Sequence, residues 1–274
     1  STIAANRRAK RSSALAFSSR ILRAKTMLPS CASSISAIRA LVAEPIPAIA
    51  AWAPVGTSAV GNIRMGVQEL LNRPPVAQRQ PLQARAAAPV TAAPASGEYM
   101  SDAFLMHTLT QLRGRDSIIV EESPGSRPII QTYLPIYQSE TFYTMCSGGL
   151  GHSMPASVGV ALAKPDKKVI AVIGDGSAMY AIQALWSAAH LKLPITFIIV
   201  KNRRYAALQE FSSVFGYQPG EKVEGTDLPD LDFVALAKGH GCDGVRVTDA
   251  AQLSQVLQDA LNSPRPILVE VEVA

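Results

Sequence analysis

The stretch that decides the fold is residues 169–202, which runs VIAVIGDGSAMYAIQALWSAAHLKLPITFIIVKN. It opens with five apolar residues, Val169 to Ile173, a run typical of a strand buried on both faces of a parallel sheet. The turn Gly174-Asp175-Gly176-Ser177 follows, and apolar residues then recur at helical spacing as far as Leu191. After a proline comes a second buried strand, Ile195 to Val200. The stretch therefore predicts one strand–helix–strand crossover, right-handed by default.

Two polar side chains stand where the strands of such a sheet bind ligands. Asp175 follows the first strand and Asn202 follows the second, 27 positions later, and the carboxyl ends of neighbouring parallel strands meet at one edge. A carboxylate, an amide oxygen and backbone carbonyls are hard oxygen ligands that suit Mg²⁺. A helix beginning near Ser177 would point free N–H groups at the same place, which favours a diphosphate. The pattern predicts a magnesium–diphosphate site, although a Gly-Asp-Gly turn alone is also an ordinary strand-to-helix connection.

These residues resemble the cofactor motif of the thiamine-diphosphate-dependent enzymes, in which Gly-Asp-Gly is paired with a later Asn. Within that family the sequence is most similar to the benzoylformate decarboxylases. The resemblance is nearly unbroken from about Glu98 to Ala274, and a shorter match covers about Ala51 to Arg73. The runs that carry it are residues 147–151, 173–177, 180–189, 202–208 and 225–232.

The chain divides into four segments. Residues 98–274 alternate strands and helices, which predicts an α/β fold, a doubly wound parallel sheet of about six strands. By resemblance, this is the domain that binds thiamine diphosphate and Mg²⁺, and residues 51–73 are a remnant of the family's middle domain. Residues 74–97 contain five prolines among alanines and predict an extended linker. Residues 1–50 are an irregular N-terminal extension that matches no domain.

Apolar patterning predicts the remaining elements of residues 98–274. Ser101 is expected to cap the first helix, and the loop at 216–229 is expected to cover the site because of its length. The expected strands lie at 118–121, 141–145, 244–247 and 267–273. The expected helices lie at 102–112, 127–134, 155–163, 204–214, 233–239 and 253–261.

The N-terminal segment admits three explanations. It is rich in Ala, Ser and Arg and has eight basic residues but no acidic one before Glu44, as a transit peptide or a disordered basic arm would. Our preferred hypothesis is that it is not a native domain, because the family's middle domain should stand here. It would then be coding sequence in the wrong frame or part of a damaged gene. Translating the upstream DNA in all three frames tests this, and finding no middle-domain sequence in any frame would contradict it.

Composition excludes several classes of function. The net charge of +5 comes from the N-terminal segment, since the chain beyond residue 43 carries 18 basic and 21 acidic residues. We therefore expect no nucleic-acid partner. The three cysteines are far apart and form no CxxC, which excludes a disulfide framework or zinc site and fits a cytoplasmic protein. No run approaches the roughly 18 apolar residues of a membrane span.

The resemblance implies roles for individual residues. Leu150 is expected to wedge beneath the cofactor, so that the aminopyrimidine reaches the thiazolium carbon, although it could also be a core leucine. The implied Mg²⁺ ligands are Asp175, Asn202 and the backbone carbonyl of Arg204. The implied cofactor-binding residues are Gly148, Gly149, Leu150, Gly174, Asp175, Gly176, Ser177, Asn202 and Tyr205. Ser177 could instead cap the helix or hold both roles at once, and Tyr205 could lie at the edge of the core. The implied substrate wall, apolar and suited to an aryl 2-keto acid, is Ala207, Leu208 and Phe211.

The sequence also departs from the family pattern. Lys201 replaces the Asn that usually precedes the metal Asn, and its ammonium could pair with phosphate or crowd the metal. Pro124-Gly125 replaces hydroxyl residues found in some relatives, and Met100 stands near the place of an active-site histidine in some benzoylformate decarboxylases. His152 follows the Gly-rich turn and is expected to be a structural, hydrogen-bonded histidine.

The implied reaction is non-oxidative decarboxylation of an aryl 2-keto acid, benzoylformate to benzaldehyde and CO₂. In the family a pyrimidine-binding domain of another subunit supplies a glutamate that drives ylid formation, and nothing in residues 1–98 resembles that domain. We therefore expect this chain to be inactive alone and the intact family to be homo-oligomeric. The alternatives are one subunit of a split enzyme, an acetolactate-synthase-like reaction, or a non-catalytic degenerate fragment.

Overall fold

The structure is a computed structural model that describes residues 41–42, 59–60, 62–74, 87–95, 97–145, 148–218 and 220–274. The chain forms two compact units, Ser1–Ala84 and Arg85–Ala274. Most of the N-terminal segment, half of the expected linker and Ser147 of the Gly-rich run lie outside the described residues. The predictions made for them, and the four-segment division itself, stay predictions.

The first unit contains three described elements. Strands β1 (Leu41–Val42) and β2 (Ala59–Val60) pair in parallel, and β1 lies in the segment for which no structure was predicted. Helix α4 (Ile63–Leu71) follows β2. It begins after Asn62, whose side-chain oxygen accepts the N–H of Arg64 at 3.0 Å and so caps the helix.

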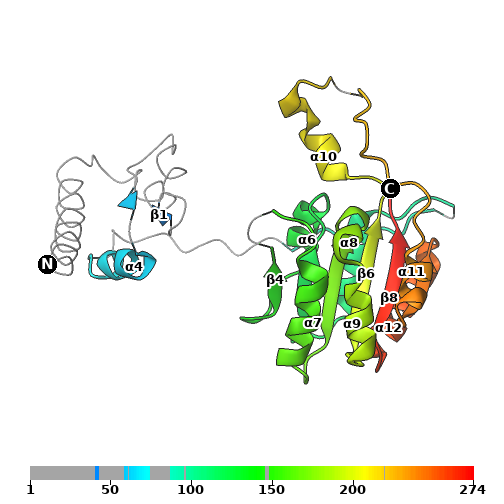
Figure 1. The fold of residues 1–274 in the computed structure, drawn as a ribbon, viewed down its shortest axis with the longest axis horizontal. Coiled ribbons are helices and arrows are strands. Elements are labelled where there is room, and N and C mark those ends of the chain that lie inside the picture. Colours follow the sequence, from blue (N-terminus) through cyan, green and yellow to red (C-terminus); the bar gives the residue numbers. More distant parts are fainter. Residues whose placement is uncertain are drawn as a thin grey trace, which may run out of the picture. The chain divides into compact units, whose positions relative to one another are not determined.

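A six-stranded parallel sheet forms the centre of the second unit (Figure 1). All neighbouring strands are parallel, which confirms the predicted α/β fold. The two strands of the deciding stretch are adjacent and fully buried but for one residue, as their unbroken apolar runs require. In spatial order the strands are β4 (Phe142–Thr144), β3 (Ile118–Glu122), β5 (Val169–Gly174), β6 (Ile195–Lys201), β8 (Ile267–Glu272) and β7 (Asp243–Val247).

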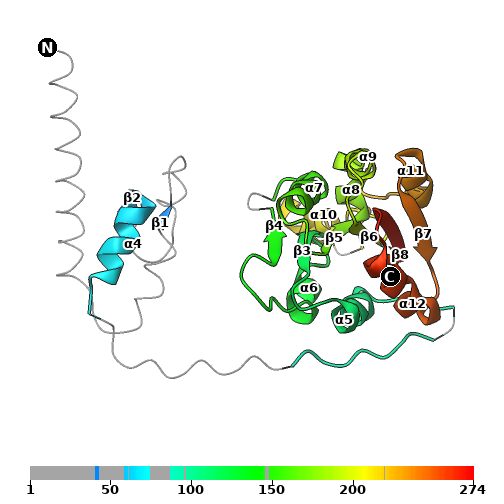
Figure 2. The same ribbon diagram turned by 90° about the horizontal axis from the view of Figure 1, so that it is seen from below.

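Helices cover both faces of this sheet (Figure 2). Four pack on one face: α7 (Ser153–Ala163), α8 (Asp175–Ala181), α9 (Ala184–His190) and α11 (Phe233–Gly239). Three pack on the other: α5 (Asp102–Leu112), α6 (Arg127–Tyr133) and α12 (Ala250–Asn262). Each layer closes its own apolar core, so the sheet is sealed on both sides and opens to ligands at its carboxyl edge. The expected Ser101 cap is confirmed, since its hydroxyl accepts the N–H of Phe104 at 3.1 Å.

Two helices differ from their predictions. The helix expected after the Gly-Asp-Gly turn is two helices, because turns from Leu185 N to Ile182 O and from Trp186 N to Gln183 O, each 3.1 Å, break its hydrogen-bond ladder. The helix expected at 204–214 is α10 (Ala206–Phe211) followed by the 3₁₀ helix η1 (Ser212–Phe215). In Figure 1, α10 stands beyond the carboxyl ends of the strands, apart from both helix layers.

Leu162 of α7 is apolar and yet 55% exposed. The α7 residues Met154, Val158 and Ala161 are the ones that are buried. They are three or four positions apart and face the sheet, whereas Leu162 follows Ala161 on the outer side.

Candidate functional site

The strand order reverses between β3 and β5, and a cavity of about 250 Å³ opens at their carboxyl ends. This is the topological switch point at which open parallel sheets bind ligands. Its lining includes most of the residues predicted for cofactor, metal and substrate: Gly148, Leu150, Gly174, Asp175, Gly176, Ser177, Asn202, Arg204, Tyr205, Ala207 and Leu208. The other lining residues are Ser123, Pro124, Gly125, Ser126, Tyr180, Val200 and Ala206. A larger cavity of about 380 Å³ lies beside α10 and contains none of the predicted site residues.

Asp175 and Asn202 meet on one turn. Asp175 Oδ2 accepts the N–H of Arg203 at 2.6 Å, and Asn202 Oδ1 accepts the N–H of Arg204 at 3.1 Å. The two amides belong to consecutive peptide units, so both side-chain oxygens are bonded to one short turn. Arg203 takes a left-handed conformation, φ 60°, which costs about 1–2 kcal/mol for a residue other than glycine. The strained turn brings the two predicted oxygen ligands together.

The buried Asp175 carboxylate forms no ion pair in the part of the chain that the structure describes. It is 3% exposed, and its bonded donors are the backbone N–H groups of Gly176, at 2.8 Å, and of Arg203. Burial raises the pKa of this carboxyl above its ordinary value, and the hydrogen bonds from the backbone oppose the rise. Each carboxylate oxygen has two lone pairs and can accept more than one bond. A buried anion with unused lone pairs is a fitting ligand for a divalent cation.

A metal site here would need ligands other than acidic side chains. No three His, Cys, Asp or Glu side chains gather to hold a metal ion in the part of the chain that the structure describes. Asp175, the Asn202 amide oxygen and a backbone carbonyl form a mixed oxygen set, and such a set suits Mg²⁺ completed by water and phosphate oxygens. The donor chemistry therefore fits the predicted ion.

Gly176 provides a space that a side chain would fill. A Cβ on this residue would lie 2.5 Å from Cδ1 and Cε1 of Tyr205, so the tyrosine ring packs directly over the glycine. Tyr205 is half-buried and lines the cavity. Its predicted place beside the cofactor motif agrees with this contact, and the alternative of a core-edge tyrosine describes the same packing.

The suggested capping role of Ser177 is wrong. Helix α8 begins at Asp175, its N-cap is Gly174, and no side chain caps it. The Asp175 carboxylate accepts the Gly176 N–H instead, so Ser177 lies inside the first turn. It is 4% exposed and lines the cavity, where it remains a candidate donor to a ligand.

The Gly-rich turn before α7 is fixed by a residue that the sequence did not single out. Gly148 and Leu150 line the cavity, whereas Gly149 is not among its lining residues. Glu122, the last residue of β3, is 1% exposed and accepts the N–H of Gly151 and of Ser153, each at 2.6 Å. Its neighbour Glu121 was expected to end the strand. The sequence signal that could have identified Glu122 is its position as a second glutamate at the end of a predicted buried strand. Glutamate is rarely buried without a partner, so such a residue is expected to bond to a nearby segment.

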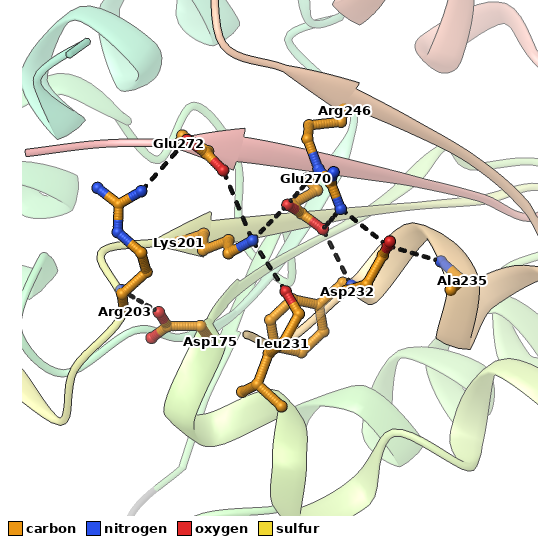
Figure 3. A network of polar contacts seen from close by, with 10 residues as sticks. Asp175, Lys201, Arg203, Leu231, Asp232, Ala235, Arg246, Glu270 and Glu272 are labelled. Atoms are coloured by element: carbon orange, nitrogen blue, oxygen red, sulfur yellow. Dashed lines mark hydrogen bonds and ion pairs between the residues drawn. The ribbon is translucent and has the colours of Figure 1, made fainter. Parts of the chain in front are cut away.

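Lys201 points away from the cavity. Its ammonium donates to Glu270 at 2.7 Å and to the carbonyl of Leu231 at 2.9 Å, and it lies 3.6 Å from Glu272 (Figure 3). Glu270 is fully buried and also accepts from Arg246 at 2.7 Å. The expectation that Lys201 could pair with phosphate or crowd the metal is therefore wrong, because alternation along β6 turns it from Asn202.

The other residues that depart from the family pattern lie in the cavity lining or in the core. Pro124 and Gly125 line the cavity, and a Cβ on Gly125 would lie 3.3 Å from Cβ of Ala206, so the pair lets α10 approach. Met100 is fully buried and bridges Val273, which places it in the core and not in the cavity lining. His152 lies exposed with Nδ1 3.4 Å from the Ser153 hydroxyl, which agrees with a structural histidine.

The predicted substrate residues lie on α10. Ala207 and Leu208 line the cavity. Phe211 is one turn further on, is not among the lining residues, and packs edge-on against Phe215 with ring centroids 5.8 Å apart. Leu208 is 57% and Phe211 is 56% exposed, so this apolar wall is uncovered in the single chain.

Comparisons relate this chain to known proteins. Residues 125–271 match the family model described as thiamine pyrophosphate enzyme, C-terminal TPP binding domain. Benzoylformate decarboxylase of Pseudomonas aeruginosa is 36% identical over 225 residues, which are 82% of this chain and 42% of that protein. An acetolactate synthase of Bacillus subtilis is 31% identical over 58% of this chain and 27% of that protein.

A solved structure is similar as well. The thiamine diphosphate-dependent 4-hydroxybenzoylformate decarboxylase of Rhodococcus jostii has a TM-score of 0.70 and 36% identity, and the match covers 82% of this chain and 42% of that one. The chain thus spans less than half the length of these relatives. Among its described residues, no helix is long and apolar enough to cross a bilayer.

Proposed function

Because this chain belongs to the thiamine pyrophosphate enzyme family, we propose that it is the diphosphate- and Mg²⁺-binding part of an aryl 2-keto acid decarboxylase. Membership confirms the resemblance drawn from the sequence. It makes the protein one of the thiamine-diphosphate-dependent enzymes, whose decarboxylases and synthases are its relatives. The cofactor is thiamine diphosphate, another name for thiamine pyrophosphate, and Mg²⁺ is the usual partner metal of the family.

The observation that carries the proposal is the shared turn of Asp175 and Asn202. These two side chains, with the backbone carbonyl of Arg204, would hold Mg²⁺. The N–H and hydroxyl groups of Gly176 and Ser177 would donate to the diphosphate. When bound, thiamine diphosphate supplies the nucleophilic carbon and the electron sink that decarboxylation of a 2-keto acid requires. The protein side of the site binds and orients that group.

The substrate proposed is an aryl 2-keto acid such as benzoylformate. Ala207 and Leu208 present an apolar wall to the cavity, and Phe211 continues the same helix. The names of the Pseudomonas and Rhodococcus relatives include benzoylformate and its 4-hydroxy derivative. An aromatic ring would bury this wall, whereas the methyl group of pyruvate would leave most of it exposed.

We expect the chain to need a pyrimidine-binding domain from another chain or subunit. Leu208, Phe211, Val214 and Phe215 are each more than half exposed, and so many large apolar side chains on one short segment favour a partner surface. The alternatives remain a subunit of a split enzyme, an acetolactate-synthase-like reaction, and a fragment without catalysis. The Bacillus relative is the observation that keeps the synthase reaction in view.

Trans-complementation separates these alternatives. The purified chain is mixed with the N-terminal part of the Pseudomonas enzyme that it does not match, together with thiamine diphosphate and Mg²⁺. We expect benzaldehyde from benzoylformate in the mixture and no turnover by the chain alone. Acetolactate from pyruvate would favour the synthase reaction. Turnover without the added part would contradict the need for a partner, and calorimetry showing no cofactor binding would favour the non-catalytic fragment.

A further inference from the structure

Glu122 is a buried carboxylate whose surroundings are unusual. It ends β3, pairs in register with Ile173 of β5, and is 1% exposed. No ion pair involves it in the part of the chain that the structure describes. Its charge is met by two backbone N–H groups, those of Gly151 and Ser153, at 2.6 Å each. Ser153 is the first residue of the eleven-residue helix α7, so the carboxylate also lies at the positive end of that helix.

These two bonds determine where the Gly-rich turn stands. Gly151 has φ 93°, and a Cβ on it would lie 3.0 Å from Cβ of Tyr180. The turn is therefore pressed against α8 and tied to β3 by Glu122. Leu150 directly precedes Gly151 and lines the cavity. A displacement at Glu122 would be transmitted to Leu150 through one peptide unit.

Glu121 is the natural comparison. It is also 1% exposed and directly precedes Glu122 in β3. Its carboxylate accepts from Ser123 N at 2.7 Å, from the Thr144 hydroxyl at 2.7 Å and from Arg127 at 3.1 Å. None of these partners belongs to the Gly-rich turn. The two glutamates therefore share burial and strand, and differ in whether they hold Leu150.

We propose that Glu122 is a positioning residue that sets the height of Leu150 under the ring portion of the bound cofactor. The inference rests on the proposed function. A carboxylate is needed because both partners are donors: an ionised carboxylate accepts at both oxygens, whereas a Gln amide accepts at one and turns a second donor toward the other N–H. One buried N–H would lose its partner, and the turn would move.

The test uses the full chain and two probes, thiamine diphosphate with Mg²⁺ and inorganic diphosphate with Mg²⁺, titrated by calorimetry. Glu122→Gln should weaken binding of thiamine diphosphate about tenfold and leave binding of inorganic diphosphate within about twofold, because only the first probe has a ring to rest on Leu150. Glu121→Gln should lower stability but keep the ratio of the two affinities. Equal losses for both probes in Glu122→Gln, or no loss, would overturn the proposal.

Two further measurements keep the test decisive. Glu122→Asp retains the charge and both acceptors and is the variant to use if Glu122→Gln does not fold. It draws the turn toward β3 by one methylene and should show the same split more weakly. If the wild-type chain binds neither probe, the proposed function is wrong. In that case amide hydrogen exchange is the deciding measurement. Faster exchange at Gly151 and Ser153 in Glu122→Gln, but not in Glu121→Gln, would support the positioning of the turn by Glu122. Unchanged exchange in Glu122→Gln would refute it.

Discussion

Two groups of buried carboxylates stand at the same edge of the sheet and are held in opposite ways. Glu270, on β8, is enclosed by the ammonium of Lys201 and the guanidinium of Arg246 (Figure 3). Asp175, which begins α8 directly after β5, and Glu122, which ends β3, are also buried, and the hydrogen bonds described for their carboxylates come from backbone N–H groups. The charge of Glu270 is balanced by these two cations, and we infer that this cluster stabilises the fold. The Asp175 carboxylate forms no ion pair among the described residues, and this leaves it able to bind a cation.

The strongest test of this contrast is Glu270→Ala. It would leave Lys201 and Arg246 facing each other without their shared acceptor, and we expect a loss of about 3–5 kcal/mol in the free energy of unfolding. Urea denaturation followed by circular dichroism measures it. Lys164→Ala removes an exposed ion pair with Glu140 and should leave stability unchanged. A loss for Glu270→Ala no greater than for this control would contradict the assignment of Glu270 as a structural centre.

Asp175→Asn tests the other side of the contrast. Binding of thiamine diphosphate with Mg²⁺ should fall at least about 100-fold, because the anionic ligand is gone. The metal-free chain should change in stability by less than about 1 kcal/mol, since relief of the buried charge offsets the lost acceptor. Calorimetry and denaturation on the same sample measure the two effects. Cofactor binding unaffected by this substitution would exclude Asp175 as a metal ligand.

Gly176→Ala tests the packing beside Asp175. The new methyl would meet the Tyr205 ring at 2.5 Å, so the ring must move, and we expect a cost of about 1–3 kcal/mol in stability with weaker cofactor binding. Adding Tyr205→Ala should restore much of the stability, because it removes the ring that the methyl strikes. If the double variant is no more stable than Gly176→Ala alone, the close packing of this pair is not the cause.

Lys168, directly before β5, is a part-buried cation that is bonded to backbone carbonyls and so allows the same comparison for a positive charge. Its ammonium donates to the carbonyls of Ala260 and Ser263 at 3.2 and 3.4 Å, and burial lowers its pKa to about 8. The fold thus disfavours the charged form, so stability should be lowest below pH 8 and rise as the pH approaches the ordinary value of 10.5.

The expected gain for Lys168 is about 1–2 kcal/mol after allowing for solvent screening. Denaturation at pH 7.5 and pH 10 measures it. Lys168→Met should remove this part of the pH dependence, and an unchanged slope in that variant would show that other groups cause it.

Much of the site followed from short-range pattern. The apolar runs at 169–173 and 195–200 specified neighbouring buried strands, and the polar residues after them had to meet at one edge because parallel strands all end there. The cavity lining therefore includes nearly all the predicted residues. Phe211 and Gly149 are the exceptions, because their positions depend on how α10 and the Gly-rich turn are held and not on the strands.

The sequence by itself determined the order of strands and helices, the Gly-Asp-Gly turn, and the meeting of Asp175 with Asn202. The tertiary structure alone decided that Lys201 turns to Glu270, 69 positions away, and that Glu122 holds the turn at Gly151, 29 positions away. The physical reason is range. Apolar periodicity is set by residues a few positions apart, whereas a buried charge takes its partner from whichever distant segment the fold brings beside it, and local pattern carries no signal of that choice.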